Sequence, residues 1–369
     1  MNTRQNKIKI HLICAARPNF MKIAPLYKAL RETDWAEPVI VHTGQHYDIN
    51  MSDAFFRDLG LPGPDIHLGV GSGTHAGQTG MVMIKYEEVL TATKPDLVVV
   101  VGDVNSTMAA TLAAVKLGIK VAHLEAGLRS FDRTMPEEIN RLVTDTIADI
   151  LWTPSVDGDD NLLREGVNPS KIVRVGNIMI DSLEMLRARI EQHDVYNRYG
   201  LGKGKYGVAT FHRPANVDNE SMLRLLCEVL DNVTKSLPII LPVHPRTKSR
   251  LEQYDLLERM RSLKGLILVE PLGYVDFMNL IFNCRLVITD SGGIQEETTY
   301  LGIPCRTVRD NTERPITVTR GTNKLCRLEQ LPEEVDRILS EPPPGKAAID
   351  LWDGRVADRV VDSIREICT

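Results

Sequence analysis

The segment DSGGIQEE, residues 290–297, has the residue types that bind a phosphate group. It follows the apolar run LVIT and precedes a helical pattern, so Ser291, Gly292 and Gly293 would place backbone N–H groups at the start of a helix. Glycines there let a diphosphate approach, and the helix dipole favours its charge. One turn further, Glu297 could accept hydrogen bonds from ribose hydroxyls. A tight turn with ordinary helix capping is the alternative.

A basic pair follows the first apolar run of the chain. In the segment AARPNFMK, Arg17 and Lys22 lie five residues apart across a strand-to-helix turn. Pro18 suits the first turn of a helix, which leaves Arg17 at its entrance, where a guanidinium can hold a phosphate or sugar hydroxyls. The alternative is a solvated pair of surface cations.

Three carboxylates occupy comparable places in the first half. Asp103 follows LVVVVG, Glu125 follows KVAHL, and Glu137 opens the helical pattern PEEINRL. Carboxylates that gather at strand ends raise one another's proton affinity, as general acid–base catalysis near neutral pH requires. Asp103 could instead cap a helix, and Glu137 could be a first-turn charge. Glu125 is the hardest to explain as structural, because a carboxylate after buried strand residues is costly unless it is paired or used.

Histidines and arginines follow two apolar runs of the second half. His212 and Arg213 follow GVATF, and His244 follows PIILPV. A histidine near a phosphate donates a hydrogen bond or carries charge, although each could be a satisfied structural histidine. No HExxH motif and no C-x-x-C pair occurs among the nine histidines and six cysteines, so we expect no metal site and reduced, mostly buried thiols.

The elements that would position these residues are short apolar runs alternating with longer helical patterns, which is typical of a parallel sheet with crossover helices. We expect an α/β protein of two doubly wound, Rossmann-like domains facing a central cleft, residues 1–178 and 179–352, with a helix of about 353–369 packing back on the first. Ligands of such sheets bind outside the carboxyl ends of the strands. The runs are IKIHLIC, VIVHT, DLVVVVGD, KVAHLEAG, ILWTP and KIVRVGN, then YGVATFH, PIILPVHP, LILVEPL, LVITDSGG and PCRTVR.

The composition supports two globular domains. A chain of 369 residues exceeds what one core usually supports, and 43% hydrophobic with 25% charged residues is typical of a globular protein. The net charge of -5 without a basic run argues against a nucleic-acid partner. The aliphatic run from Leu97 to Val101 is too short to cross a membrane, and the polar start is no signal peptide. We expect a cytoplasmic protein.

Several segments in this order resemble the non-hydrolysing UDP-N-acetylglucosamine 2-epimerase family. They are ARPNFMKIAPL, HTGQHY, GDVNST, HLEAGLRS, MPEEINR, TFHRP, LPVHP, TDSGGIQEE and NTERPIT, and they cover almost the entire chain. The resemblance implies the two-domain fold of the B-type glycosyltransferases (GT-B), a UDP-amino sugar as substrate, no cofactor, and a homodimer.

The resemblance also implies a role for each matching residue. Asp103, Glu125 and Glu137 would transfer protons, and His212 would hold the diphosphate as UDP leaves. Glu297 matches the family's ribose ligand, and Phe277 lies in its uracil-binding segment. The substrate-binding residues are Arg17, Lys22, His46, Arg141, Arg213, His244, Phe277, Ser291, Gly292, Gly293, Glu297 and Arg314.

The implied reaction is a reversible epimerisation at carbon 2 of the sugar. One carboxylate removes the carbon-2 proton while UDP leaves carbon 1, and UDP then adds back to the bound 2-acetamidoglucal with protonation from the other face. Asn19 and Ala215 stand where the family commonly has glutamate. Tyr47 and Asp48 replace the Arg-Glu of members regulated by a second substrate molecule, so allosteric activation is not implied.

Four alternatives remain open from the sequence. A modified UDP-amino sugar could be the substrate, or a hydrolysing 2-epimerase could release free N-acetylmannosamine. A retaining GT-B glycosyltransferase would need an acceptor, and the carboxylate trio speaks against it. A UDP-sugar sensor would bind without turnover.

Overall fold

The computed structural model describes residues 7–44 and 59–368, and of Arg17 only the backbone. His46, Tyr47 and Asp48 lie outside the described residues. The chain folds as two compact units. Unit 1 comprises Met1–Met185 and Asp350–Thr369, and unit 2 comprises Leu186–Ile349. The sequence prediction placed the boundary between residues 178 and 179.

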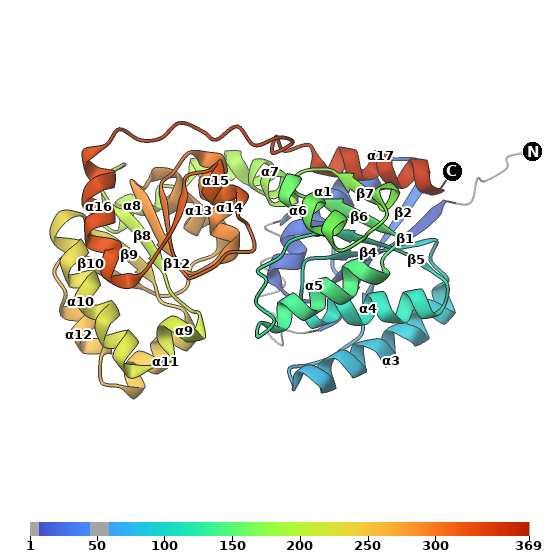
Figure 1. The fold of residues 1–369 in the computed structure, drawn as a ribbon, viewed down its shortest axis with the longest axis horizontal. Coiled ribbons are helices and arrows are strands. Elements are labelled where there is room, and N and C mark those ends of the chain that lie inside the picture. Colours follow the sequence, from blue (N-terminus) through green and yellow to red (C-terminus); the bar gives the residue numbers. More distant parts are fainter. Residues whose placement is uncertain (1–6, 45–58, 369) are drawn as a thin grey trace, which may run out of the picture. The chain divides into compact units, whose positions relative to one another are not determined.

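Unit 1 contains a parallel sheet of seven strands in the order β3-β2-β1-β4-β5-β6-β7 (Figure 1). The strands are β1 (Ile8–Cys14), β2 (Ala36–His42), β3 (Ile66–His67), β4 (Leu97–Val101), β5 (Lys120–Leu124), β6 (Ile150–Thr153) and β7 (Ile172–Arg174). The helices are α1 (Arg17–Arg31), α3 (His75–Thr93), α4 (Asn105–Lys116), α5 (Pro136–Ile147), α6 (Val156–Arg164) and, at the end of the chain, α17 (Val356–Cys368). The helix α7 (Ile178–Gln192) begins in unit 1 and ends in unit 2.

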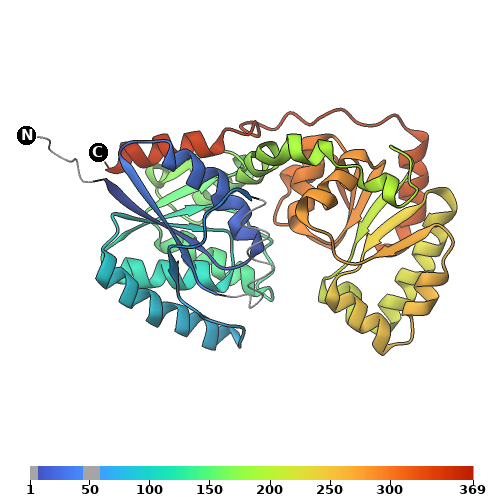
Figure 2. The same cartoon turned by 180° about the vertical axis from the view of Figure 1, so that it is seen from behind.

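Helices cover both faces of this sheet. The helices α3 and α4 lie on one face, and α1 and α17 lie on the other (Figures 1 and 2). All five residues of β4, LVVVV, are therefore buried, as a continuous apolar run in a parallel sheet predicts. The return of α17 is fixed by two indoles, since Trp152 donates to the Ser363 hydroxyl at 3.0 Å and Trp352 donates to the Pro154 carbonyl at 2.9 Å.

A buried carboxylate on α7 binds the start of α17. Oδ2 of Asp181 accepts from the backbone N–H of Ala357 at 2.8 Å. Burial raises the pKa of Asp181 to about 6. The negative charges of Asp353 and Asp358 also raise it, whereas the hydrogen bonds from Ala357 and Val356 lower it. Ionisation of Asp181 thus destabilises the folded state. The destabilisation grows as the pH rises from 3.8, the ordinary pKa of aspartate, to about 6, the pKa of Asp181 in the folded protein.

We expect Asp181→Asn to remove this pH dependence. The free energy of unfolding of the wild type should lose about 2 kcal/mol between pH 4 and pH 7 through this group alone, and the variant should not. Urea unfolding at several pH values measures the difference. Asp362→Asn, on the exposed side of α17, is the control and should keep the wild-type slope. Identical slopes in wild type and Asp181→Asn would contradict the assignment.

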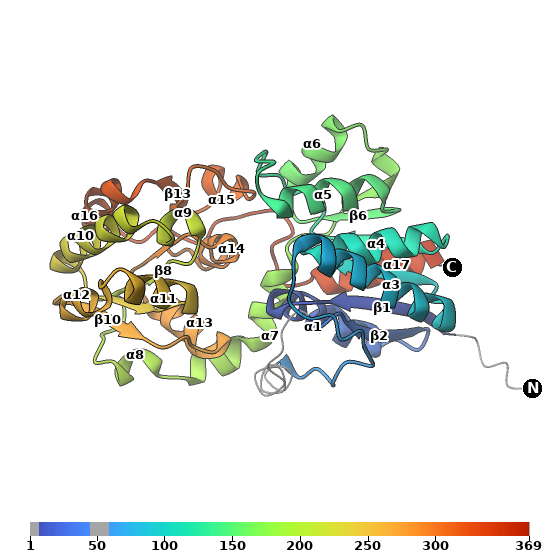
Figure 3. The same ribbon diagram turned by 90° about the horizontal axis from the view of Figure 1, so that it is seen from below.

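Unit 2 contains a parallel sheet of six strands in the order β10-β9-β8-β11-β12-β13 (Figure 3). The strands are β8 (Gly207–Thr210), β9 (Ile239–Pro242), β10 (Leu266–Val269), β11 (Leu286–Thr289), β12 (Cys305–Val308) and β13 (Asn323–Cys326). The helices are α8 (Val195–Arg198), α9 (Pro214–Val217), α10 (Glu220–Ser236), α11 (Pro245–Gln253), α12 (Leu257–Ser262), α13 (Tyr274–Asn283), α14 (Gly292–Leu301), α15 (Ile316–Thr319) and α16 (Leu331–Ser340).

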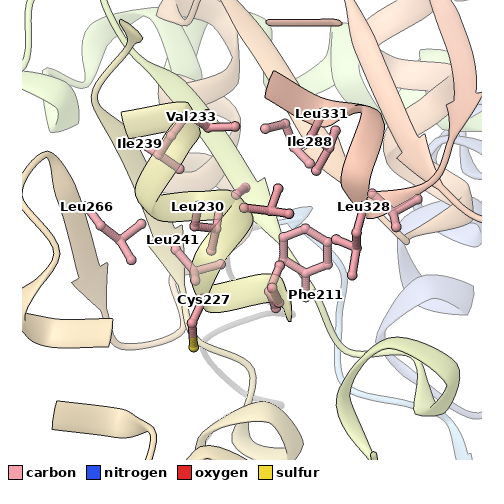
Figure 4. Packing of buried hydrophobic residues seen from close by; sticks show 14 of the residues in the cluster. Phe211, Cys227, Leu230, Val233, Ile239, Leu241, Leu266, Ile288, Leu328 and Leu331 are labelled. Carbon is pink, nitrogen blue, oxygen red and sulfur yellow. The ribbon is translucent and has the colours of Figure 1, made fainter. Parts of the chain in front are cut away.

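The core of unit 2 forms where α10 and α16 pack on the sheet. Leu230 and Val233 of α10, Ile239 of β9 and Leu331 at the start of α16 belong to one buried cluster, and Phe211, beyond the end of β8, lies beside Leu328 in it (Figure 4). Leucines recur along α10 at helical spacing, so one face of the helix is apolar and buried. The expected α/β class with two parallel sheets is confirmed.

Both sheets change direction at their first strand. The chain adds strands on one side of β1 or β8 and then crosses to β4 or β11 on the other side. Ligands of doubly wound sheets bind at such a switch point, beyond the carboxyl ends of the strands. The structure describes no helix that is long and apolar enough to cross a membrane.

Candidate active site

Glu125 lies in unit 1 directly after β5, with a backbone that few side chains adopt. Its φ of 75° is in the left-handed region, and the N–H groups of Glu125 and Ala126 both donate to the Trp152 carbonyl, at 3.1 and 3.0 Å. Strained backbone of this kind concentrates at functional sites. The side chain is buried, and its Oε2 makes a short ion pair with the ammonium group of Lys22. Among the described side chains, which do not include that of Arg17, no hydrogen-bond partner reaches Oε1.

Lys22 and Glu125 meet beside Gly102, at the switch point between β1 and β4. A Cβ on Gly102, whose φ is 67°, would lie 2.9 Å from Nζ of Lys22 and 3.5 Å from Oε2 of Glu125. Asn19 completes this corner, because its side chain donates to the Val101 carbonyl at 3.0 Å and accepts from the N–H of Ala16 at 3.0 Å. The side chain of Asn19 therefore ties the start of α1 to the end of β4.

Asp103 follows Gly102 and is held by α5. Its carboxylate lies 2.5 Å from Nη1 of Arg141, and its carbonyl accepts from the side chain of Asn140 at 2.8 Å. Asp103 does not cap α4, because Val104 occupies the cap position and no side chain makes a cap hydrogen bond there. The carboxylate of Asp103 remains 31% exposed and thus open to a ligand.

Glu138, which the sequence analysis did not single out, orients Arg141. Its Oε2 lies 2.5 Å from Nη2 of Arg141, and it accepts from the N–H groups of Ser130 at 3.0 Å and Phe131 at 2.9 Å. Burial would raise the pKa of Glu138, but the hydrogen bonds from Ser130, Arg141 and Phe131 outweigh it and lower the pKa. Its neighbour Glu137 is exposed in the first turn of α5, where the helix dipole also favours a carboxylate.

The carboxylates of unit 1 therefore come with cations that bind them. Spacing suggested a cluster in which carboxylates act on one another, whereas the structure pairs Glu125 with Lys22 and Asp103 with Arg141. Arg17 begins α1, and its side chain is not described.

In unit 2 the centre of the candidate site is Asp290, directly after β11. Its side chain is fully buried, and its Oδ1 lies 2.9 Å from Nδ1 of His212. It also accepts from the N–H groups of His212 and Arg213 and from the side chain of Asn216. Burial would raise the pKa of Asp290, but the hydrogen bonds from His212 and Arg213 hold the pKa below its ordinary value. Asp290 thus fixes the ring of His212, which is itself 38% exposed.

His244 lies beside His212 but has a second task. The two rings are 5.3 Å apart, and Nδ1 of His244 accepts from the backbone N–H of Arg246 at 3.2 Å, which caps α11. Burial, His212 and Arg246 lower the pKa of His244, against the attraction of Asp290. One nitrogen of His244 is occupied by the cap, so only Nε2 is left for a ligand.

The expected phosphate-binding segment lies at the start of a ten-residue helix, α14. Ser291 occupies the cap position without a side-chain cap bond, which argues against a purely capping role. A Cβ on Gly292 would lie 2.5 Å from Oε1 of Glu313 and 2.7 Å from Nη1 of Arg314, whereas a Cβ on Gly293 would meet nothing within 4 Å. Packing against Glu313 and Arg314 therefore leaves no room for a side chain at position 292, whereas position 293 has room for one.

One turn into α14, Glu297 is buried and accepts from the hydroxyl of Tyr274 at 2.7 Å. Tyr274 begins α13, and Phe277 lies in the next turn of the same helix, half-buried. Glu297 and Phe277 were predicted from the sequence, but Tyr274, which joins their two segments, was not.

Arg314 is held by two carboxylates. Its Nη1 lies 2.5 Å from Glu313 and its Nε lies 2.9 Å from Glu296. Arg213 approaches the same Glu313 carboxylate at 3.9 Å. Glu313 and Glu296 therefore hold Arg314 beside Gly292. Arg314 was predicted from the family resemblance alone, and its two acidic partners were not predicted. In the part of the chain that the structure describes, no group of three or more histidine, cysteine, aspartate or glutamate side chains could hold a metal ion.

Comparison with known proteins identifies the family. The model of the family described as UDP-N-acetylglucosamine 2-epimerase matches residues 28–365. A UDP-N-acetylglucosamine 2-epimerase of Methanocaldococcus jannaschii is 43% identical over 364 residues, covering 96% of this chain and 98% of that protein. The chain belongs to the UDP-N-acetylglucosamine 2-epimerase family.

A solved structure and one further relative are informative about this epimerase family. The crystal structure of the M. jannaschii enzyme in complex with UDP-N-acetylglucosamine and UDP matches with a TM-score of 0.89 and 41% identity, covering 97% of this chain and 99% of that one. A UDP-2,3-diacetamido-2,3-dideoxy-D-glucuronate 2-epimerase of Pseudomonas aeruginosa is 42% identical over 322 residues, covering 86% of this chain and 88% of that protein. Members of similar identity thus act on different UDP-amino sugars.

The glycine pair at the start of α14 gives a matched test of packing. We expect Gly292→Ala to lower the free energy of unfolding by about 1–3 kcal/mol, because the new methyl group meets the buried Glu313–Arg314 pair. Gly293→Ala should leave stability unchanged or raise it by up to about 1 kcal/mol, because the methyl group meets open space in a helix. Thermal unfolding without nucleotide measures both. Equal midpoints for the two variants would contradict the packing described for Gly292.

Proposed function

We propose that this chain is a UDP-N-acetylglucosamine 2-epimerase that interconverts UDP-N-acetylglucosamine and UDP-N-acetylmannosamine without hydrolysis. The observation that carries the proposal is the state of Glu125, a buried carboxylate on strained backbone with one oxygen bound to Lys22 and the other without a partner among the described residues. A structural carboxylate would use both oxygens. The family membership and the full-length relatives support the same activity.

The proposed mechanism is an elimination followed by an addition. A carboxylate takes the proton from carbon 2 as the bond from carbon 1 to the UDP oxygen breaks, and the electron pair of the C–H bond forms the double bond of 2-acetamidoglucal. UDP then adds back to carbon 1 while carbon 2 receives a proton on the opposite face. Glu125, Asp103 and Glu137 are the proposed proton-transfer groups, because two acid–base positions are needed on opposite faces.

The carbon-2 proton is weakly acidic, so the departure of UDP must be assisted. Cations and backbone N–H groups that stabilise the developing phosphate charge supply this assistance. In unit 2 we assign it to His212, oriented by Asp290, and to the N–H groups at the start of α14. Arg314 adds a guanidinium beside Gly292. In unit 1, Lys22 and Arg141 hold the acid–base carboxylates in place.

Product analysis tests the proposed activity. The purified protein is incubated with UDP-N-acetylglucosamine, and nucleotide sugars, free UDP and free sugars are separated by chromatography. We expect a mixture of the two UDP-N-acetylhexosamines and little free UDP. Steady release of free N-acetylmannosamine would instead show hydrolysis. Turnover of only the diacetamido-glucuronate substrate of the Pseudomonas relative would replace the sugar but keep the reaction class.

We also propose that the chain forms a homodimer. Among the described residues, Met81 and Ile84 are large apolar side chains that are 44% and 56% exposed, and they lie one turn apart on α3. A second copy of the chain would remove such side chains from water. Light scattering should give about twice the chain mass of 41.3 kDa, and the mass of a single chain would contradict the proposal.

A further inference from the structure

Arg309 lies at the edge of the unit 2 sheet where the candidate nucleotide-binding residues gather. The strands β9, β8, β11 and β12 are neighbours in this order and run parallel. Just beyond their carboxyl ends come His244, His212, Asp290 and Arg309, respectively. Arg309 therefore continues the same row at the next strand.

The side chain of Arg309 is buried, and one of its N–H donor groups has no acceptor among the described residues. It is 4% exposed, and its Nη2 lies 2.8 Å from Oε2 of Glu313 and 3.3 Å from Oδ1 of Asn311. Its Nη1 is buried and has no hydrogen-bond partner within the described part of the chain. A buried guanidinium N–H without an acceptor is costly, so this group calls for an acceptor that the described residues do not supply.

Three cations and two carboxylates of the described residues meet around Glu313. Three guanidinium groups, those of Arg213, Arg309 and Arg314, lie within 4 Å of its carboxylate, and Glu296 is the second carboxylate of the group. The charges of these five side chains sum to +1, not counting Asp290, which accepts from the backbone N–H of Arg213. Oε1 of Glu313 would be 2.5 Å from a Cβ on Gly292, so this excess lies directly behind the start of α14.

We propose that Arg309 is a further diphosphate-binding residue of this site, positioned by Glu313. The inference rests on the proposed function, because it takes the nucleoside diphosphate as the anion. Nη1 of Arg309 donates to a phosphate oxygen, and Glu313 holds the guanidinium through Nη2. A guanidinium that is already fixed by a carboxylate loses little freedom when it binds the anion.

Binding of UDP and of uridine by variants tests the role of Arg309. We expect Arg309→Gln to weaken UDP binding about tenfold or more and to leave uridine binding unchanged, because only UDP has the phosphate oxygens. Arg309→Lys keeps a charge near Glu313 but loses the forked donor, so it should show a smaller loss for UDP alone. Arg224→Gln, which breaks an exposed ion pair with Glu220 on α10, is the control.

The outcomes separate this inference from the proposed function. Wild-type affinity for UDP in a folded Arg309→Gln protein, or equal losses for UDP and uridine, would overturn the role of Arg309. If Arg309→Gln does not fold, the lysine variant decides by the same comparison. A wild type that binds no UDP would refute the proposed function itself, whereas a wild type that binds UDP and epimerises leaves only the role of Arg309 in question.

Glu313→Gln gives a test of opposite sign. If Glu313 acted only through its charge, removing a negative group near a phosphate would strengthen UDP binding. If Glu313 positions Arg309, its removal frees the guanidinium and weakens UDP binding, with uridine binding unchanged. We expect the weaker binding, and tighter UDP binding by Glu313→Gln would overturn the positioning role.

Discussion

Replacing Glu125 by glutamine should reduce turnover by about a hundredfold to ten-thousandfold and leave UDP affinity unchanged. An amide cannot accept the carbon-2 proton, and it also loses the ion pair with Lys22. The groups assigned above to the departing UDP, His212, Arg314 and the start of α14, belong to unit 2, whereas Glu125 belongs to unit 1. The rate of UDP-N-acetylmannosamine formation and the calorimetric affinity for UDP measure the two effects separately.

Glu165→Gln is the matched control for this variant. Glu165 also pairs with a buried cation of unit 1, Arg129, at 2.7 Å, but its own side chain is 33% exposed and lies outside the proposed site. The Glu165→Gln variant should have a lower free energy of unfolding than the wild type and the same turnover. A folded Glu125→Gln protein with wild-type turnover would show that Glu125 has no part in proton transfer.

Asp290→Asn should lower kcat/KM by about a hundredfold, equivalent to about 3 kcal/mol. An asparagine side chain has one acceptor oxygen where the carboxylate has two, so the N–H groups of His212 and Arg213 and the ring of His212 compete for it. His212 then loses the partner that fixes its ring. Steady-state kinetics of the epimerisation measure the loss.

A double variant shows whether Asp290 acts through His212. If it does, Asp290→Asn combined with His212→Gln should be hardly worse than His212→Gln alone, because residues that work as a unit are not additive. Losses of the two single variants that multiply in the double variant would contradict a positioning role. Thermal unfolding of all three proteins separates this result from a loss of folded protein.

The sequence predicted most of the fold because the strands are continuous apolar runs. Eleven of them were placed from the sequence, and each contains or closely overlaps a strand of the structure. Two strands at sheet edges were missed. The pairing of β3 spans only Ile66 and His67, and β13 has the sequence NKLC, which contains no β-branched residue.

The candidate site was predicted less completely, because its residues act through partners far away in the chain. Lys22 and Glu125 are 103 residues apart, and His212 and Asp290 are 78 apart. Spacing placed each residue after a strand but could not show which cation meets which carboxylate. No role was predicted for Asp290, although it lies in the expected phosphate-binding segment. None was predicted for Glu138, the neighbour of Glu137. Only the strand order brings such residues together.

The central claim is that a carboxylate removes the proton at carbon 2 while UDP leaves, and proton exchange in heavy water tests it most directly. Proton NMR would follow UDP-N-acetylglucosamine with the purified protein in heavy water. We expect UDP-N-acetylmannosamine that carries deuterium at carbon 2, with deuterium also entering the remaining UDP-N-acetylglucosamine and little free UDP accumulating. Epimerised product that keeps its original carbon-2 proton would contradict it.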